Sequence, residues 1–129
     1  MEEKKANLSI EDRLKLVYSV GEEIIEDQDQ IKSLLEKKPE IIAYDGFEPS
    51  GKIHIAQGLL RAINVNKLTK AGMKFIFFVA DWHAAANNKF GGNLEVIQKV
   101  GEYFIEVWKA CDMDLKNVKE DKFMYMIIV

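Results

Sequence analysis

Apolar residues near the N-terminal end of the chain recur every three or four positions, which predicts two amphipathic helices. Ser9 followed by Asp12 is a capping pattern that places the start of the first helix at this point. Gly21 interrupts this helix, the second helix starts again near Asp27, and Pro39 ends it. The apolar positions assigned to the two helices are Ile10, Leu14, Val17, Tyr18, Ile24, Ile25, Ile31, Leu34 and Leu35.

From residue 41 onward, short continuous apolar runs alternate with longer helical patterns. A run that is apolar on consecutive residues is typical of a strand covered on both faces, as in parallel sheets. Asn93 is a suitable N-cap for the last helix. The predicted strands are residues 41–44, 75–80 and 123–129, and the predicted helices are residues 55–70 and 93–112, with a flexible connection at residues 87–92.

The order of these elements predicts the fold class. Alternation of strand and helix favours a parallel sheet with right-handed crossovers and helices on both faces. We therefore expect an α/β chain in which residues 1–40 form an N-terminal helical segment. Residues 41–129 are expected to form the first half of a Rossmann-like nucleotide-binding domain.

Composition narrows the class of protein without identifying its chemistry. With 129 residues, 48% hydrophobic and 30% charged, the chain is long enough for one globular domain with a core. A net charge of -3 gives no overall basic signature, so any RNA contact would use a local patch. Cys111 is the single cysteine, which excludes an internal disulfide and favours a reducing compartment. No apolar run reaches membrane-spanning length and no secretory signal is present, so we expect a cytoplasmic location.

The segment from Tyr44 to His54 carries the strongest chemical signal in the chain. It leads from a predicted strand into a predicted helix, and Gly46, Gly51 and the proline between them make it a tight loop. Ser50 and His54 offer hydrogen-bond donors to phosphate, and the helix N-terminus adds backbone N–H groups. Such donors suit adenylate formation, in which positioning and stabilisation of charge on the phosphate carry the catalysis.

The same string, Tyr-Asp-Gly-Phe-Glu-Pro-Ser-Gly-Lys-Ile-His, closely resembles the nucleotide-binding signature of class I aminoacyl-tRNA synthetases, in the form used by tyrosyl-tRNA synthetases of archaeal and eukaryotic type. By this resemblance, His54 matches the first histidine of the His-Ile-Gly-His motif, which contacts the ATP phosphates. Gly46 and Ser50 match positions that wrap the nucleotide. Tyr44 matches the residue whose hydroxyl meets the phenol of the substrate tyrosine, and Glu48 matches an acidic position near both sites.

The string departs from the family's motif at two positions. Ala56 stands where the motif has glycine, which implies a slightly different seat for adenine, and Gln57 stands where it has the second histidine. Gln57 can still donate a hydrogen bond but cannot carry charge. We therefore expect it to keep the donor role with less dependence on pH than a histidine would show. His54 and Gln57 are the expected catalytic residues, and Gly46 and Ser50 complete the expected ATP-binding set.

A second segment with candidate chemistry follows the strand at residues 75–80. Asp81 and His83 come directly after it, at the carboxyl end where parallel sheets bind ligands. Taken alone, His83 is more typical of a packed side chain. The run Phe78-Val79-Ala80-Asp81-Trp82-His83, however, resembles a wall of the family's tyrosine pocket, written there as Ala-Asp-x-His, which implies a supporting role for Asp81. The expected tyrosine-binding residues are Tyr44, Glu48, Phe78, Ala80 and His83.

The resemblance covers about residues 10–118 and implies part of a tyrosine–tRNA ligase. Such an enzyme activates tyrosine with ATP and Mg²⁺, which act as a substrate complex rather than a tightly bound cofactor, and transfers it to tRNA(Tyr). The resemblance also implies a homodimer for the full-length form and no membrane partner. The two histidines and one cysteine lack the spacing of metal ligands, so we expect no metal site.

Two alternatives stay open on the sequence. A tryptophan–tRNA ligase shares the fold, although Tyr44 and the Phe-Glu-Pro-Ser run favour tyrosine. The other alternative is a non-catalytic, truncated nucleotide-binding fragment. It is favoured because the rest of the family's tyrosine pocket and its Lys-Met-Ser-Lys-Ser-like loop do not occur in this sequence. We therefore expect the chain alone to be inactive in aminoacylation.

Overall fold

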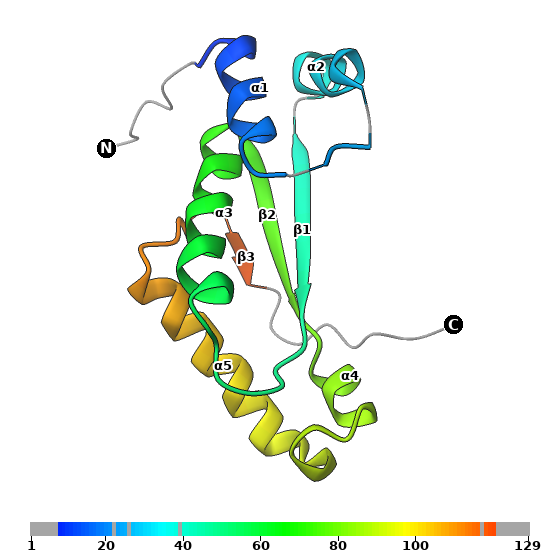
Figure 1. The fold of residues 1–129 in the computed structure, drawn as a ribbon, viewed down its shortest axis with the longest axis vertical. Helices are drawn as coiled ribbons and strands as arrows, with labels where there is room; N and C mark the ends of the chain where they lie inside the picture. Colours follow the sequence, from blue (N-terminus) through cyan, green and yellow to red (C-terminus); the bar gives the residue numbers. More distant parts are fainter. Residues whose placement is uncertain (1–7, 22, 26, 39, 117, 121–129) are drawn as a thin grey trace.

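The sheet consists of three parallel strands, β1 (Ile41–Phe47), β2 (Met73–Val79) and β3 (Val118–Glu120), in that order (Figure 1). The computed structural model describes residues 8–21, 23–25, 27–38, 40–116 and 118–120. Ile41 lies opposite Met73, and Phe75 lies opposite Val118. The predicted α/β fold with a parallel sheet is confirmed.

Two of the predicted strands are confirmed with longer bounds, and the third is found elsewhere. β1 continues past Tyr44 to Phe47, and β2 begins at Met73. The strand predicted at residues 123–129 lies outside the described residues, whereas β3 begins at Val118. The β3 segment carries a single apolar residue, so its local pattern does not indicate a strand. Its position comes from main-chain pairing with β2.

The N-terminal helices, α1 (Ile10–Tyr18) and α2 (Gln28–Lys37), both begin at a capped N-terminus. The Ser9 hydroxyl oxygen accepts from the backbone N–H of Asp12 at 3.1 Å, as the capping pattern predicts. The Asp27 carboxylate accepts from the backbone N–H of Gln30 at 2.8 Å. These bonds satisfy backbone donors that the first helical turn leaves without partners.

The prediction that Ile24 and Ile25 belong to the second helix is wrong. The Asp27 cap places the first helical residue at Gln28, and both isoleucines lie before it in the connection. Ile25 is fully exposed, at 101% of its reference area. The second helix ends at Lys37, close to the predicted end, although Pro39 lies outside the described residues.

The helical patterns after β1 are confirmed. Residues 55–70 contain the π-helix η1 (Ala56–Leu60) and α3 (Arg61–Lys70), and residues 93–112 contain α5 (Leu94–Ala110). Two short helices, α4 (Asp81–Ala86) and η2 (Lys89–Gly92), lie between β2 and α5. The sequence indicates only a connection at residues 87–92, because elements this short show no periodicity. None of the helices in the described ranges is long and apolar enough to cross a membrane.

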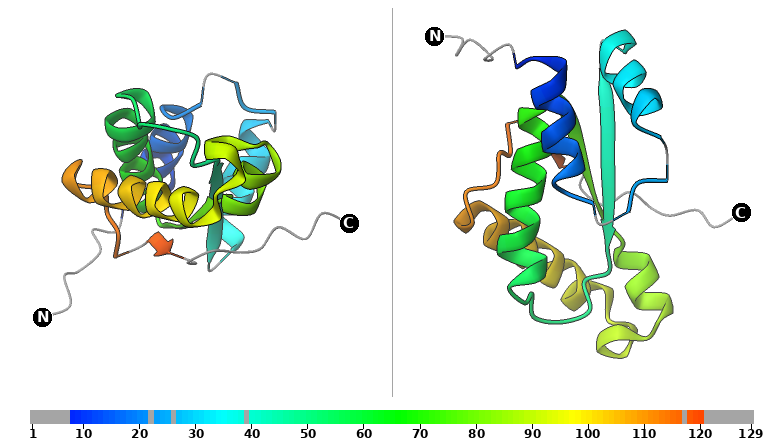
Figure 2. Two further views of the ribbon diagram at one scale, coloured as in Figure 1. Left: turned by 90° about the horizontal axis from the view of Figure 1, so that it is seen from below. Right: turned by 45° about the horizontal axis from the view of Figure 1, so that its top comes forward.

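Helices α3 and α5 lie on one side of the sheet, as the view along the strands shows (Figure 2). The core between these helices and the sheet is rich in aromatic side chains. Trp108 stacks on Phe77 with ring centroids 4.3 Å apart and lies 5.1 Å from Phe47, while Phe104 meets Trp108 edge to face at 6.0 Å. Trp108 is 1% exposed. This packing fixes the carboxyl ends of β1 and β2 against α5.

A second core cluster joins the N-terminal helices to the same sheet. Leu14 of α1 and Leu35 of α2 pack against Met73 of β2. Arg13 strengthens this junction, because its Nε donates to the carbonyl of Ala71 at 2.6 Å and its Nη1 donates to the carbonyl of Leu35 at 3.1 Å. The division of the chain at residue 40 stays a prediction.

The opposite face of the sheet is open in the described part of the chain. Side chains alternate along a strand, so Ile42 and Tyr44 share this face with Ile76 and Phe78 of β2. Ile42 is 56% exposed and Tyr44 is 78% exposed, and Ile76 and Phe78 are half-buried. The expectation that β1 and β2 are buried on both faces is therefore not met within these residues. Both described core clusters lie on the α3 and α5 side, so helices cover one face here.

Candidate functional site

The ends of β1 and β2 bring the two predicted site segments to one edge of the sheet. The backbone N–H of Ala80 donates to the carbonyl of Phe47 at 2.7 Å. The loop at residues 48–54 leaves this edge toward η1, and α4 begins here at Asp81 (Figure 1). The predicted ATP-binding loop and the helix that carries His83 are therefore neighbours, at the edge where parallel sheets bind ligands.

Glu48 links these two segments directly. Its Oε2 accepts from Asn87 Nδ2 at 2.8 Å and lies 3.6 Å from His83 Nε2, and its Oε1 lies 3.5 Å from Lys89 Nζ. The structure thus brings together Glu48 and His83, two predicted tyrosine-binding residues. Asn87 and Lys89 are additions that the sequence did not indicate, because they belong to a polar connection with no chemical pattern.

We expect replacement of Glu48 by alanine to loosen this edge. The substitution removes one hydrogen bond to Asn87 and an ion pair to Lys89 that is partly exposed, so the free energy of unfolding should fall by about 1 kcal/mol. Amide hydrogen exchange at residues 87–92 should become faster, which mass spectrometry can measure. Glu95→Ala, which removes an exposed helix pair with Lys99, is the matched control and should leave residues 87–92 unchanged. Equal exchange in the two variants would contradict the linking role of Glu48.

Gly46 near the end of β1 and Gly51 of the loop have room for a side chain in the described part of the structure. A Cβ atom on Gly46 would meet Phe78 at 3.6 Å, which is ordinary van der Waals contact, and one on Gly51 would meet none of the described atoms within 4 Å. Neither glycine adopts a positive φ. Within the described residues, neither crowding nor backbone conformation therefore demands glycine at these two positions, and their part in ligand binding stays a prediction.

His54 and Gln57 lie side by side at the start of η1. The backbone N–H of Gly58 donates to the carbonyl of His54 at 2.9 Å, and the side-chain oxygen of Gln57 is 3.4 Å from the backbone N–H of His54. His54 and Ser50 are exposed, and Gln57 is half-buried. The side chain of Gln57 therefore contacts the backbone of His54, and His54 is open to solvent.

The remaining predicted tyrosine-binding residues divide between the open face and the core. Tyr44 and Phe78 lie on the open face, where Gly46 is opposite Phe78. Ala80 is 9% exposed and packs within the core. The open face therefore presents the apolar ring of Phe78, the phenol hydroxyl of Tyr44 and, at Gly46, a stretch of backbone that carries no side chain.

Asp81 is a buried carboxylate that positions α4. It is 1% exposed, and its oxygens accept from the backbone N–H of Trp82 at 2.7 Å and from Gln98 Nε2 at 3.1 Å. Gln98 belongs to α5, so Asp81 ties the start of α4 to that helix. The predicted role of Asp81 in supporting a tyrosine site stays a prediction, and its partner Gln98 was not indicated by the sequence.

Arg61 is a further residue that the sequence did not single out. Its guanidinium forms an ion pair with Asp45 of β1 and lies 5.0 Å from the ring centroid of Phe47. The pair joins the junction of η1 and α3 to β1. Asp45 lies in the Tyr44–His54 string, but Arg61 lies outside it, so the sequence does not indicate that the two residues pair.

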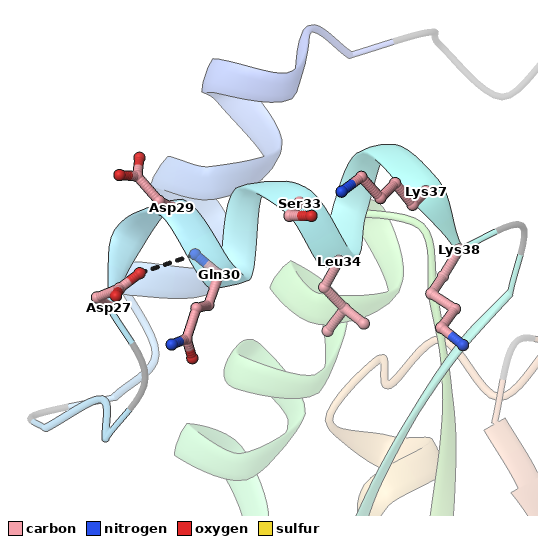
Figure 3. Close-up of a pocket in the computed structure, with 7 residues that line it drawn as sticks. All are labelled: Asp27, Asp29, Gln30, Ser33, Leu34, Lys37 and Lys38. Atoms are coloured by element: carbon pink, nitrogen blue, oxygen red, sulfur yellow. Dashed lines mark hydrogen bonds between the residues drawn. The ribbon is translucent and has the colours of Figure 1, made fainter.

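A pocket of about 470 Å³ on α2 lies away from this edge (Figure 3). Its walls come from the α2 cap and one face of that helix, at the opposite end of the sheet from the loop (Figure 1). It contains none of the predicted site residues. Its lining residues are Asp27, Asp29, Gln30, Ser33, Leu34, Lys37 and Lys38.

Known proteins resemble this chain over most of its length. Residues 36–126 match the family described as tRNA synthetases class I (W and Y). Tyrosine–tRNA ligase 1, cytoplasmic, of Arabidopsis thaliana is 54% identical over 110 residues, which are 85% of this chain and 28% of that protein. The tyrosine–tRNA ligase of Sulfolobus acidocaldarius is 38% identical over 87% of this chain and 30% of its own length. The chain therefore spans less than a third of these relatives.

Solved structures resemble the fold equally well. The tyrosyl-tRNA synthetase of Leishmania major in complex with tyrosinol has a TM-score of 0.83 and 55% identity, over 88% of this chain and 17% of that chain. The enzyme of Aeropyrum pernix has a TM-score of 0.79 and 30% identity, over 88% of this chain and 34% of its own. The match over residues 36–126, together with these likenesses, places the chain in the family of class I tRNA synthetases for tryptophan and tyrosine.

Proposed function

We propose that this chain forms the nucleotide-binding part of a tyrosine–tRNA ligase. Such an enzyme joins the carboxylate of tyrosine to the α-phosphate of ATP, releases pyrophosphate, and transfers the tyrosyl group to tRNA(Tyr). The relatives named above are tyrosine–tRNA ligases, which supports tyrosine over tryptophan. The observation that carries the proposal is the pair of glycines, Gly46 in β1 and Gly51 in the loop, that neither crowding by the described residues nor backbone conformation demands.

In this proposal the loop after β1 holds ATP. Gly46 leaves room for the nucleotide, and Ser50, His54 and Gln57 donate hydrogen bonds to it. His54 and Gln57 are the catalytic pair, because donors that meet negative charge developing on the phosphate lower the energy of the transition state. Mg²⁺ enters with ATP as part of the substrate complex. The support is that His54 and Gln57 lie next to each other at the exposed start of η1.

The tyrosine substrate would occupy the neighbouring part of the same edge. Tyr44 presents a hydroxyl for the substrate phenol, Phe78 and Ala80 supply apolar surface, and Glu48 with His83 forms the polar end. A buried partner for the phenol is the feature that rejects phenylalanine, and the known example of such selectivity is itself a tyrosyl-tRNA synthetase. The support is that Tyr44 and Phe78 share the open face of the sheet, and that Glu48 and His83 are in contact.

Aminoacylation, the tRNA partner, a homodimeric longer form and a cytoplasmic location all belong to this proposal. The cytoplasmic location is supported by the name of the Arabidopsis relative. Because the chain spans 28% and 30% of the Arabidopsis and Sulfolobus relatives, we expect the isolated chain to bind ATP without catalysing aminoacylation at the family's rate. Turnover by the isolated chain at such a rate would contradict this expectation.

A Gly46→Ala variant tests the nucleotide assignment. The added methyl group should weaken ATP binding by about tenfold, a cost of about 1.4 kcal/mol, because it fills the space through which the ligand approaches the backbone. The free energy of unfolding should stay the same, since the nearest protein atom is 3.6 Å away. ATP affinity is measured by NMR titration and stability by urea unfolding. Lost stability with unchanged ATP affinity would show that Gly46 is structural.

Gly101→Ala is the matched control for this experiment. Gly101 lies in α5, and its added Cβ would come within 2.9 Å of a Val79 methyl group, which forces a shift in the core. We expect this variant to lose about 1 kcal/mol of stability after the helix propensity gained by alanine is subtracted. Its ATP affinity should remain that of the wild type while it is folded.

A further inference from the structure

An α-type turn, closed by the backbone N–H of Gly58 and the carbonyl of His54, follows the loop, and the next turn is a π-turn that leaves the Gln57 carbonyl without its α-helical donor. In an α-helix the backbone N–H of Arg61 would donate to the carbonyl of Gln57. Here it donates to the carbonyls of Ala56 and Gly58, and the N–H of Leu60 donates to the carbonyl of Ile55 at 3.2 Å. Single π-turns of this kind are uncommon and are frequent at functional sites.

Trp108 of α5 takes the place of the missing α-helical donor. Its indole Nε1–H donates to the carbonyl of Gln57 at 2.9 Å, from a residue 51 positions away. The indole is held rigidly, because it is 1% exposed and stacked on Phe77. A side-chain donor this well fixed stabilises the carbonyl direction that the π-turn requires.

The π-turn also lies close to α5 next to this bond. A Cβ atom on Gly58 would lie 3.3 Å from a Val107 methyl group, so the absence of a side chain at Gly58 lets the turn reach α5. Gly58 therefore allows the π-turn to approach α5, and the hydrogen bond from Trp108 holds the turn in that place.

The π-turn affects how the preceding turn, which carries His54 and Gln57, is oriented relative to α3. One residue of register in a helix corresponds to a rotation of about 100°. If the turn reverted to α-helical bonding, residues at its start would rotate away from their present direction. In the structure, the side-chain oxygen of Gln57 faces the backbone N–H of His54 at 3.4 Å, toward the loop.

We propose that Trp108 is a positioning residue for the nucleotide-binding loop: its indole N–H holds the π-turn, and the π-turn sets the orientation of the turn that carries His54 and Gln57 relative to α3. The part of this proposal that concerns ATP rests on the proposed function. The part that concerns the turn stands on the hydrogen bonds of the protein alone.

Trp108→Phe tests the proposal, because phenylalanine keeps an aromatic ring in the core and removes the donor. Hydrogen-bond scalar couplings measured by NMR should link the Arg61 amide to the Ala56 carbonyl in the wild type and to the Gln57 carbonyl in the variant. ATP affinity, measured by NMR titration, should fall about tenfold. Phe104→Leu is the matched control: it disturbs the same aromatic cluster without touching the π-turn, so it should lower stability and leave both readouts unchanged.

Gly58→Ala is the second variant, and it leaves the indole intact. It should push the turn away from α5, weaken the bond to Trp108, and change the couplings in the same direction. It also keeps the test available if Trp108→Phe does not fold. The inference would be overturned if the folded variants kept the coupling between the Arg61 amide and the Ala56 carbonyl. It would also be overturned if His54→Ala weakened ATP binding while Trp108→Phe and Gly58→Ala left the ATP affinity unchanged. If the wild type does not bind ATP, or if His54→Ala leaves ATP binding unchanged, the proposed function fails. In that case the NMR couplings alone decide the role of Trp108.

Discussion

Replacement of Trp108 by alanine is expected to lower the free energy of unfolding by about 3–5 kcal/mol, the usual range for a large aromatic side chain removed from a core. Trp108 is 1% exposed and lies within 6.0 Å of three aromatic rings, so the cavity cannot close by a small shift. Domains of this size are stable by about 5–15 kcal/mol, so the variant would lose a large share of its stability.

Urea unfolding followed by far-UV circular dichroism is the appropriate measurement, since the substitution removes a fluorophore. Trp82→Ala is the matched control. Trp82 is 47% exposed, so its replacement should cost less than about 1 kcal/mol. Equal losses in the two variants would mean that the aromatic cluster does not dominate the stability of the sheet edge.

Replacement of His54 by alanine is expected to weaken ATP binding by about 10- to 100-fold. The estimate follows from the loss of one hydrogen bond to a charged group, worth about 1.5–3 kcal/mol. Stability should not change, because His54 is exposed and its backbone bonds do not involve the imidazole. NMR titration with ATP gives the dissociation constant, and the shifted amide signals should belong to residues 46–58.

Ser33→Ala is the control for this experiment, since Ser33 lies on α2 at the far end of the sheet. It should bind ATP as the wild type does. Two results would remove His54 from the site: an ATP affinity that survives the His54 substitution, or amide shifts confined to α2.

Much of the fold could be predicted because its signals are local. The apolar runs of β1 and β2 and the helical pattern at residues 55–70 are properties of neighbouring residues, and the structure has these elements. The Ser9 cap could likewise be predicted, because Ser9 and its partner Asp12 are only three residues apart in the sequence. Alternation of strand and helix then leaves few topologies other than the parallel sheet.

What the sequence did not reveal depends on contacts between distant segments. β3 is a strand because β2 offers it a free edge, whereas Lys119 and Glu120 carry no strand signal. Ile24 and Ile25 fit the helical spacing but lie outside the helix, because the Asp27 cap determines where it begins. An apolar run also does not show how many faces of a strand are covered.

The same limit applies to the candidate site. The loop residues from Tyr44 to His54 form a continuous string, so their order alone carries the assignment. The contacts that hold the loop come from elsewhere: Asn87 reaches Glu48 across 39 residues, and Trp108 reaches Gln57 across 51. The sequence does not predict such pairs, because the two residues come together only in the folded structure.

The contacts of Glu48 couple the loop after β1 to the segment from His83 to Lys89. Its carboxylate faces the imidazole of His83 in α4 and, just after that helix, the amide of Asn87 and the ammonium group of Lys89, so displacing either segment would break contacts with the other. We therefore expect a shift of the loop to change the surroundings of His83 as well.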